Sequence, residues 1–184
     1  STIQLLKDKY IFLLFFGILC IVGIDVGLNT SIPKLLIEKT GMAVEKAGLG
    51  TSLYFAARTI GSFIGAIVLV RYAASRFLQY TIIIAIASFI ILLLVDNIWF
   101  IYAMIAVVGF MCANVFSIIF SFALNHKKEQ ANEVSALMIM GVSGGALFTP
   151  LMGIISDNFG QVYGLSVLLI CLFYLLYVSL KKQK

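Results

Sequence analysis

Residues 10–36, YIFLLFFGILCIVGIDVGLNTSIPKLL, form a run of 27 positions in which Asp25 and Lys34 are the only charged residues. A helix needs about 20 apolar residues to cross the roughly 30 Å hydrocarbon core of a bilayer. The run is long enough for that, and its apolar residues are continuous instead of alternating with polar ones, which favours a helix over a membrane strand. Residues 10–36 therefore predict a transmembrane helix.

The composition of the whole chain agrees with a membrane location. Of the 184 residues, 62% are hydrophobic and only 11% are charged, and the mean hydropathy is +1.10. A soluble domain uses about 25% charged residues to cover its surface, so most of this chain faces something other than water. The same figures exclude an intrinsically disordered protein, a disulfide-rich scaffold and a nucleic-acid-binding module.

Outward from this run, five further segments are long and apolar enough to cross the membrane. The connections between them are short and polar and leave no room for a soluble domain. We therefore predict an all-α membrane protein in which residues 1–184 form a single bundle of six transmembrane helices. The expected spans are 10–36, 47–70, 77–95, 98–124, 134–156 and 162–180.

The basic residues predict which way the six spans run. Nine of the 13 Lys and Arg residues fall on one side of the predicted membrane, Lys34, Lys39 and Lys46 fall on the other, and Arg58 lies within a span. Positive residues mark cytoplasmic loops, so we expect both termini in the cytoplasm. The net charge of +5 is then a topology signal and gives no reason to expect a nucleic-acid partner. The nine are Lys7, Lys9, Arg71, Arg76, Lys127, Lys128, Lys181, Lys182 and Lys184.

Polar residues are costly inside a membrane unless they face a partner or water, so their positions map the interior of the bundle. Spans one, two, four and five each carry polar or small residues at helical spacing, whereas spans three and six are almost wholly apolar. We expect the first four to line a polar interior and the other two to lie at the periphery, as two three-helix inverted repeats require. The stripes are Asp25 and Asn29; Tyr54, Arg58, Gly61 and Gly65; Asn114, Ser117 and Ser121; and Ser143, Gly144, Gly145, Thr149 and Pro150.

Asp25 and Arg58 are the two charges placed deepest within the spans. Spans one and two run in opposite directions, so both residues lie within about 5 Å of the midplane at a rise of 1.5 Å per residue. An ion pair between them either fixes helix packing alone or forms part of a substrate or proton site. In the second case Asp25 takes up a proton when Arg58 moves away or a ligand competes for the carboxylate.

Three more residues are candidates for binding the substrate or a proton: Asn29, Tyr54 and Asn114. Tyr54 lies one turn from Arg58 and has a ring that could stack on a sugar.

Small residues point to packing and to a hinge. Gly61 and Gly65 are four apart and allow close approach of another helix. In span five, Gly144, Gly145 and Pro150 also weaken the helical hydrogen bonding near the middle of the membrane, and a bent helix there could act as a hinge.

The sequence lacks the residues that an enzyme of this size and type would need. The segment 141–144, GVSG, resembles the serine motif of rhomboid proteases, but that chemistry needs a buried histidine as base. The single histidine, His126, lies in a polar loop about a whole span away from Ser143. One histidine and three scattered cysteines also cannot build a metal centre. We therefore predict no enzymatic activity, no cofactor and no metal.

Four segments resemble the major facilitator superfamily of transporters, and most closely its fucose:proton symporter (sugar permease) family. The most specific is residues 144–160, GGALFTPLMGIISDNFG, which is similar to the region of that family's eleventh helix. Residues 58–65, RTIGSFIG, with the basic loop 71–76 and the following Phe77 and Leu78, are similar to its eighth helix and the loop behind it. Residues 22–29 and 114–121 occupy the places of the seventh and tenth helices.

The resemblance implies the C-terminal half of a twelve-helix secondary active transporter in a bacterial inner membrane. Such a protein moves a small polar solute, here a sugar, by alternating access and with proton coupling, and 184 residues suit half of one. The expected partners are the solute, protons, membrane lipid, and either an N-terminal six-helix half or a second copy of this chain. The alternatives are a uniporter without ion coupling and a six-helix scaffold or sensor that transports nothing.

One loop departs from the superfamily pattern. The segment between spans two and three lacks the aspartate and glycine of the best-known loop motif of that superfamily and keeps only its basic residues. We therefore expect Arg71 and Arg76 to pair with Glu129 or Glu133 near the start of span five.

Overall fold

A computed structural model describes residues 1–181 of the chain. Lys182 and Lys184, which were counted in the charge argument, lie outside the described residues. The helical elements are η1 (Thr2–Lys7), α1 (Lys9–Thr40), α2 (Val44–Leu69), α3 (Ala74–Leu94), α4 (Ile98–Cys112), α5 (Val115–His126), η2 (Lys128–Gln130), α6 (Ala131–Met140), η3 (Gly141–Ser143), α7 (Gly144–Phe159) and α8 (Gln161–Leu180).

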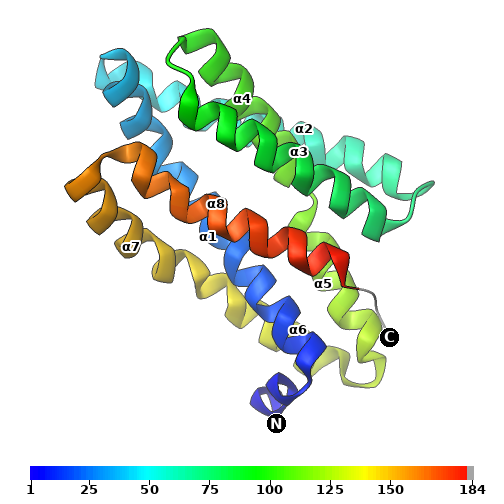
Figure 1. Cartoon of the computed structure of the whole chain (residues 1–184). Helices are drawn as coiled ribbons and strands as arrows, with labels where there is room; N and C mark the ends of the chain where they lie inside the picture. The colour runs from blue at the N-terminus through cyan, green and yellow to red at the C-terminus, as the bar shows by residue number, and fades with distance from the viewer. Residues whose placement is uncertain (182–184) are drawn as a thin grey trace.

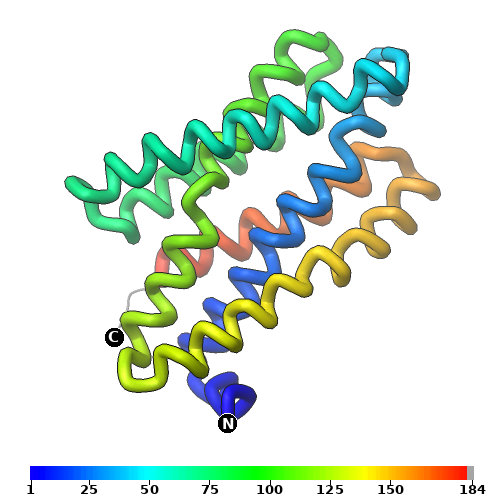
Figure 2. Tube along the Cα trace, turned by 180° about the vertical axis from the view of Figure 1, so that it is seen from behind, coloured from blue at the N-terminus to red at the C-terminus, as the bar shows by residue number. Residues whose placement is uncertain are grey.

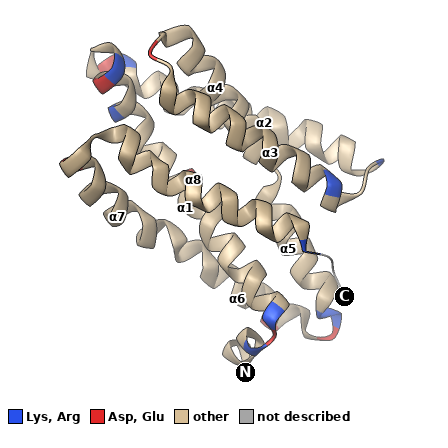
Figure 3. Cartoon of the chain, viewed as in Figure 1, with Lys and Arg blue, Asp and Glu red and all other residues tan. Residues whose placement is uncertain are grey.

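Six helical segments are long and apolar enough to cross a membrane, and residues 1–181 contain no strand. They are α1, α2, α3, α4 with α5, α6 with α7, and α8 (Figure 1). The prediction of an all-α bundle with six transmembrane helices is therefore confirmed. Most charged residues gather at the two ends of the bundle (Figure 3), and Asp25 and Arg58 are the exceptions. The limits of each span within the bilayer stay predictions.

Helix α1 is the central helix of the bundle. Asp8 caps its first turn by accepting hydrogen bonds from the amides of Tyr10 (2.9 Å) and Ile11 (3.3 Å). Gly41, at φ 67°, ends it in the left-handed conformation that suits glycine. In its most apolar stretch, 61% of α1 is buried inside the bundle, compared with 17% for α2 and 28% for the span formed by α6 and α7. The core therefore forms around α1, and α2 and α7 leave most of their surface open.

The first helix of each triplet of spans packs on helices of the other triplet. Helix α1 packs on α7 and α8, which belong to the second triplet, and α4 packs on α2 and α3, which belong to the first. Helices α3 and α8 also pack on each other, on the side of the bundle away from α2 and α7 (Figures 1 and 2). A twofold relation between two three-helix units produces this pattern, because each contact then occurs twice with the roles of the units reversed.

Span four is interrupted, although the sequence was expected to form one continuous helix over residues 98–124. Helix α4 ends at Cys112 and α5 begins at Val115. Asn114 has φ −107° and ψ 2°, outside the helical region, and its side-chain amide donates to the backbone carbonyl of Gly61 on α2 (3.0 Å). Asparagine competes with helical hydrogen bonds in this way, so the break coincides with the contact between α2 and span four.

Span five is interrupted as well, and here the sequence predicted a weak point. The break is η3, one turn before the predicted weak point at Gly144 and Gly145, and Pro150 lies inside α7. A Cβ atom on Gly144 would contact the backbone of Leu19, and one on Gly141 would lie 2.8 Å from a methyl group of Ile18. The small residues of span five therefore let it approach α1 closely, whether or not they also act as a hinge.

Glycine also sets the distance between α2 and α4. A Cβ atom on Gly61 would lie 2.6 Å from the carbonyl oxygen of Phe110, and one on Gly65 would overlap the Asn114 amide. From the other side, a Cβ atom on Gly109 would lie 2.5 Å from the carbonyl oxygen of Tyr54. The two helices therefore touch through their backbones, which only glycine permits.

This contact makes a matched pair of substitutions informative. We expect Gly61→Ala to lower the free energy of unfolding by about 1–3 kcal/mol, because the added methyl group clashes with the backbone of α4. Gly48→Ala, on the same helix, should leave stability unchanged or raise it by about 0.5–1 kcal/mol, because no atom lies within 4 Å of the new methyl group. Thermal unfolding in detergent measures both, and equal effects of the two variants would contradict the packing described here.

Candidate functional site

An ion pair lies near the middle of the bundle. The Asp25 carboxylate on α1 accepts hydrogen bonds from the Arg58 guanidinium (Nη2 to Oδ2, 2.8 Å) and from the Tyr54 hydroxyl (to Oδ1, 2.7 Å), both on α2. The side chains of Asp25 and Arg58 are 19% and 25% exposed. Each carboxylate oxygen therefore has its own donor, and the charge is balanced by the guanidinium that the sequence pointed to.

Helix periodicity brings both donors to the same carboxylate. Tyr54 and Arg58 are one turn apart and so lie on one face of α2. The Tyr54 side chain is fully buried and lies against the backbone of α4 at Gly109. Its ring has no open face, so the structure does not support the expectation that Tyr54 stacks on a sugar in this conformation. Its hydroxyl instead donates a hydrogen bond to Asp25, and a direct role in solute binding stays a prediction.

The two asparagine candidates lie away from the carboxylate. Asn29 is one turn beyond Asp25 on α1 and is exposed, and its backbone carbonyl accepts a hydrogen bond from the Thr51 hydroxyl at 3.5 Å. Asn114 is 8% exposed and its amide is engaged with the Gly61 carbonyl. Asn29 thus keeps an accessible side chain, whereas Asn114 joins two spans.

One polar group of the site has its hydrogen-bonding capacity left over. The Nε atom of Arg58 is buried and has no hydrogen-bond partner among the described residues. A buried donor without an acceptor is costly, so an acceptor placed beside this atom would stabilise it. Hydroxyl-bearing side chains also remain exposed along the spans expected to line the interior: Ser52, Thr59, Ser117, Ser121 and Ser143.

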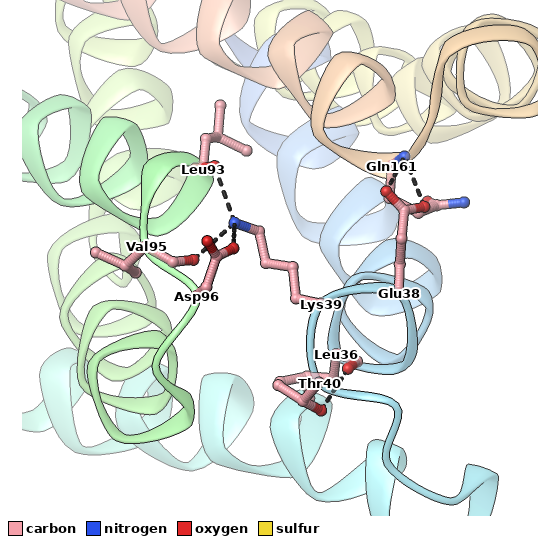
Figure 4. A network of polar contacts seen from close by, with 8 residues as sticks. All are labelled: Leu36, Glu38, Lys39, Thr40, Leu93, Val95, Asp96 and Gln161. Carbon is pink, nitrogen blue, oxygen red and sulfur yellow. Dashed lines mark hydrogen bonds and ion pairs between the residues drawn. The ribbon is translucent and has the colours of Figure 1, made fainter.

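At the end of the bundle opposite the termini, the last turn of α1 joins the two triplets (Figure 4). The Lys39 ammonium donates to the carbonyls of Leu93 (3.0 Å) and Val95 (2.6 Å) at the end of α3, and lies 3.3 Å from the Asp96 carboxylate. The Glu38 carboxylate accepts a hydrogen bond from the backbone amide of Gln161, the first residue of α8. A cation thus meets the C-terminal end of one helix and an anion meets the N-terminal end of another, as the helix dipole favours.

At the other end, Asp8 joins the start of α1 to the end of span four. Its Oδ2 atom lies 3.1 Å from His126 Nε2 and 3.2 Å from Lys127 Nζ, and the His126 ring lies against Tyr10, with 4.8 Å between centroids. Burial raises the pKa of Asp8, but the hydrogen bonds from His126, from the Ile11 and Tyr10 amides and from Lys127 outweigh it, so the pKa lies below its ordinary value.

The expected pairing of Arg71 and Arg76 with Glu129 or Glu133 is not present. Within residues 1–181, the ion pairs are those of Asp25, Asp8 and Asp96 described above. All four side chains of the expected pairing are exposed, and an exposed pair between long flexible side chains gains little. The two arginines instead border a cavity between α2, α3 and α4.

Six apolar helices with an ion pair near their middle define a multi-pass integral membrane protein. The sequence pattern of the Major Facilitator Superfamily matches residues 14–183. The chain belongs to this superfamily.

Curated relatives carry more specific names. A predicted glucose/galactose transporter of Helicobacter pylori is 24% identical over 186 residues, which cover 98% of this chain and 46% of the relative. An L-fucose-proton symporter of Haemophilus influenzae is 35% identical over 100 residues, covering 53% of this chain and 22% of the relative. At 46% of the first relative, the chain spans about half the length of that protein.

Solved structures show the same fold. A transporter of the superfamily, FucP, in the outward conformation superposes with a TM-score of 0.90 at 20% identity, over 100% of this chain and 45% of that one. The Escherichia coli fucose:proton symporter FucP matches with a TM-score of 0.90 at 19% identity, over 98% and 45%. The predicted resemblance to the superfamily is therefore confirmed, and the six helices take a fold that makes up less than half of those chains.

The ion pair can be tested by a double-mutant cycle. Asp25→Asn and Arg58→Gln should each lower the free energy of unfolding by about 3–5 kcal/mol, because each leaves the other charge buried without a partner. The double variant should lose less than the sum of the two. Unfolding in detergent measures the three variants, and additive losses would show that the two side chains do not interact.

The Asp8 cluster predicts a dependence of stability on pH. Because the folded pKa of Asp8 lies below its ordinary value of 3.8, the ionised carboxylate stabilises the fold at pH values above 3.8, and this contribution is lost as the pH falls through the folded pKa. Asp8→Asn keeps a helix-capping side chain but removes the charge. We expect its stability deficit in detergent to be full near neutral pH and to vanish in acid; a deficit that does not change with pH would contradict the cluster.

Proposed function

We propose that this chain is the C-terminal six-helix half of a secondary active transporter that moves a sugar across a bacterial inner membrane, with both termini in the cytoplasm. The observation that carries the proposal is the network of Asp25, Arg58 and Tyr54 near the middle of the bundle in a member of the Major Facilitator Superfamily. Ionisable residues at this depth are costly and mark pathways for substrates or protons.

The accessible polar groups suit a polyhydroxylated solute. Asn29, Ser117 and Ser143 leave amide and hydroxyl groups exposed on three spans, and the Arg58 Nε donor has no partner among the described residues. Sugar hydroxyls both donate and accept hydrogen bonds and so match such a lining. The names of the relatives, a glucose/galactose transporter and an L-fucose-proton symporter, support the same solute class.

The ion pair supplies a way to couple the solute to a proton. While Arg58 holds the Asp25 carboxylate, the guanidinium balances its charge and both of its oxygens accept hydrogen bonds. A solute that takes over the Arg58 donors removes this partner, and the buried carboxylate then binds a proton in place of the lost charge. When the solute leaves, Arg58 returns and the proton is released, so solute and proton move together.

A second six-helix unit completes the site in this proposal. Helices α2 and α7 are mostly exposed, and they leave apolar side chains such as Phe63, Ile67, Leu147 and Ile154 uncovered. An N-terminal half, or a second copy of this chain, would cover part of this surface and place the solute between the two units. Alternating access then follows from rocking one unit against the other.

Asp25→Asn separates coupling from binding. In vesicles that hold the complete transporter, we expect this variant to lose sugar accumulation driven by a proton gradient, because the amide cannot take up a proton, while exchange of sugar across the membrane continues. Radiolabelled sugar measures both activities, and the exchange assay shows that the variant is folded and binds its solute. Driven accumulation that persists at the normal level would overturn the coupling role of Asp25.

The solute class has its own test. Binding of fucose, galactose, glucose and amino sugars to the complete transporter should saturate for at least one of them and should vary with pH if a proton binds with the sugar. Absence of saturable binding across the panel would remove the sugar assignment. Saturable binding with no dependence on pH would favour a uniporter.

A further inference from the structure

A cavity of about 640 Å³ lies between α2, α3 and α4, apart from the Asp25 site. Its walls are mostly apolar and come from all three helices. Its two charged side chains, Arg71 and Arg76, lie together at one end, in the connection between α2 and α3 and at the start of α3, and Asn114 lies near Gly61 at the other end. The apolar wall includes Ile64, Val68, Phe77, Ile84, Phe110 and Met111.

The dimensions of the cavity match one leaflet of a bilayer. It extends from Gly61 on α2 to Arg71, two residues beyond the end of that helix, which is about 15 Å at a rise of 1.5 Å per residue. That is half of the roughly 30 Å hydrocarbon thickness. Gly61 lies close to Arg58 in the sequence and so near the middle of the membrane, whereas Arg71 lies at the boundary with water. The cavity thus runs from the membrane surface to its centre.

The charge at the surface end has no acidic partner among the residues that the structure describes. Arg71 and Arg76 are both exposed, and neither forms an ion pair with another of residues 1–181. The first turn of α3 lies beside them. Its N-cap residue, Ala73, has no side-chain oxygen that could accept hydrogen bonds from the unpaired backbone amides of that turn. Two guanidinium groups and a helix N-terminus together favour an anion at this point.

Two tyrosines border the same cavity. Tyr72 and Tyr80 are 67% and 66% exposed, and both line it. Tyrosine is enriched where the headgroups of a membrane meet the hydrocarbon region, because its ring is apolar and its hydroxyl is polar. They fit the level at which a lipid headgroup joins its acyl chains.

We propose that this cavity binds an anionic phospholipid of the leaflet on the side of the two termini. Its phosphate lies between Arg71 and Arg76, and one acyl chain lies along the apolar wall towards Gly61. Basic pockets between transmembrane helices recognise anionic headgroups in this way. A protein segment bound in the cavity would need an acidic residue beside each arginine. It would also not explain why the length of the cavity equals the thickness of one bilayer leaflet.

Lipid retention measured by native mass spectrometry tests the proposal on the full chain in detergent. We expect phosphatidylglycerol to remain bound in preference to phosphatidylcholine. The double variant Arg71→Gln and Arg76→Gln should lower phosphatidylglycerol affinity about tenfold or more, because each basic residue near a membrane surface contributes separately to the attraction. Because both arginines are exposed, the double variant should keep its fold, and circular dichroism checks this.

A matched control separates a site from general attraction. Lys7→Gln with Lys9→Gln removes the same charge from the same side of the membrane at two exposed residues and should leave the affinity nearly unchanged. Ile84→Trp fills the cavity without changing charge and should also weaken binding. Equal losses in the two double variants, or equal retention of the two lipids, would overturn the proposal.

The place of binding is checked with a photoactivatable phosphatidylglycerol that carries its reactive group on the acyl chain. Cross-links should fall in peptides that contain residues 61–84 and 110–114. Cross-links confined to α7 or α8 would also overturn the proposal. None of these readouts depends on sugar transport, so the lipid site and the proposed function succeed or fail separately.

Discussion

A carboxylate in the middle of an apolar bundle has to be paired, and the packing of the first two spans follows from this requirement. Asp25 receives one donor on each oxygen, and both donors come from a single face of α2. For Tyr54 and Arg58 to reach it, α2 has to lie against α1. The same helix also touches span four backbone to backbone, through the glycines at positions 61, 65 and 109.

The interrupted spans follow from the same close packing. Span four breaks where Asn114 turns away from its own helix to reach the Gly61 carbonyl, and span five breaks at η3, where Gly141 and Gly144 lie against α1. Under the exchange of contacts between the triplets, these are corresponding places: the second span of one triplet meets the first span of the other. Each of the two interruptions therefore lies at a contact between the triplets.

The sequence predicted the features that follow from the free-energy cost of placing polar groups in a membrane. It did not predict those that depend on contact with a particular residue of another helix. Continuous apolar runs and two deep charges were enough for the six spans and for the partnership of Asp25 with Arg58. The break at Asn114 depends on the Gly61 carbonyl, and the burial of Tyr54 depends on Gly109, and neither can be read from one helix. The contacts of Lys39 are with backbone carbonyls, which every residue has, so residue types do not predict them. Nothing in the sequence showed that Arg71 and Arg76 would not pair with Glu129 or Glu133.

The position of the ion pair in the first two spans bears on how the chain enters a membrane. The partner of Asp25 lies on the very next helix, although α1 packs more extensively on α7 and α8, which come later in the chain. The hairpin of α1 and α2 thus carries both charges and can neutralise them before α7 and α8 are inserted. Pairing Asp25 with Arg58 lowers the free-energy cost of placing this hairpin in lipid. Helix α1 is then electrically neutral when α7 and α8 are inserted and pack against it.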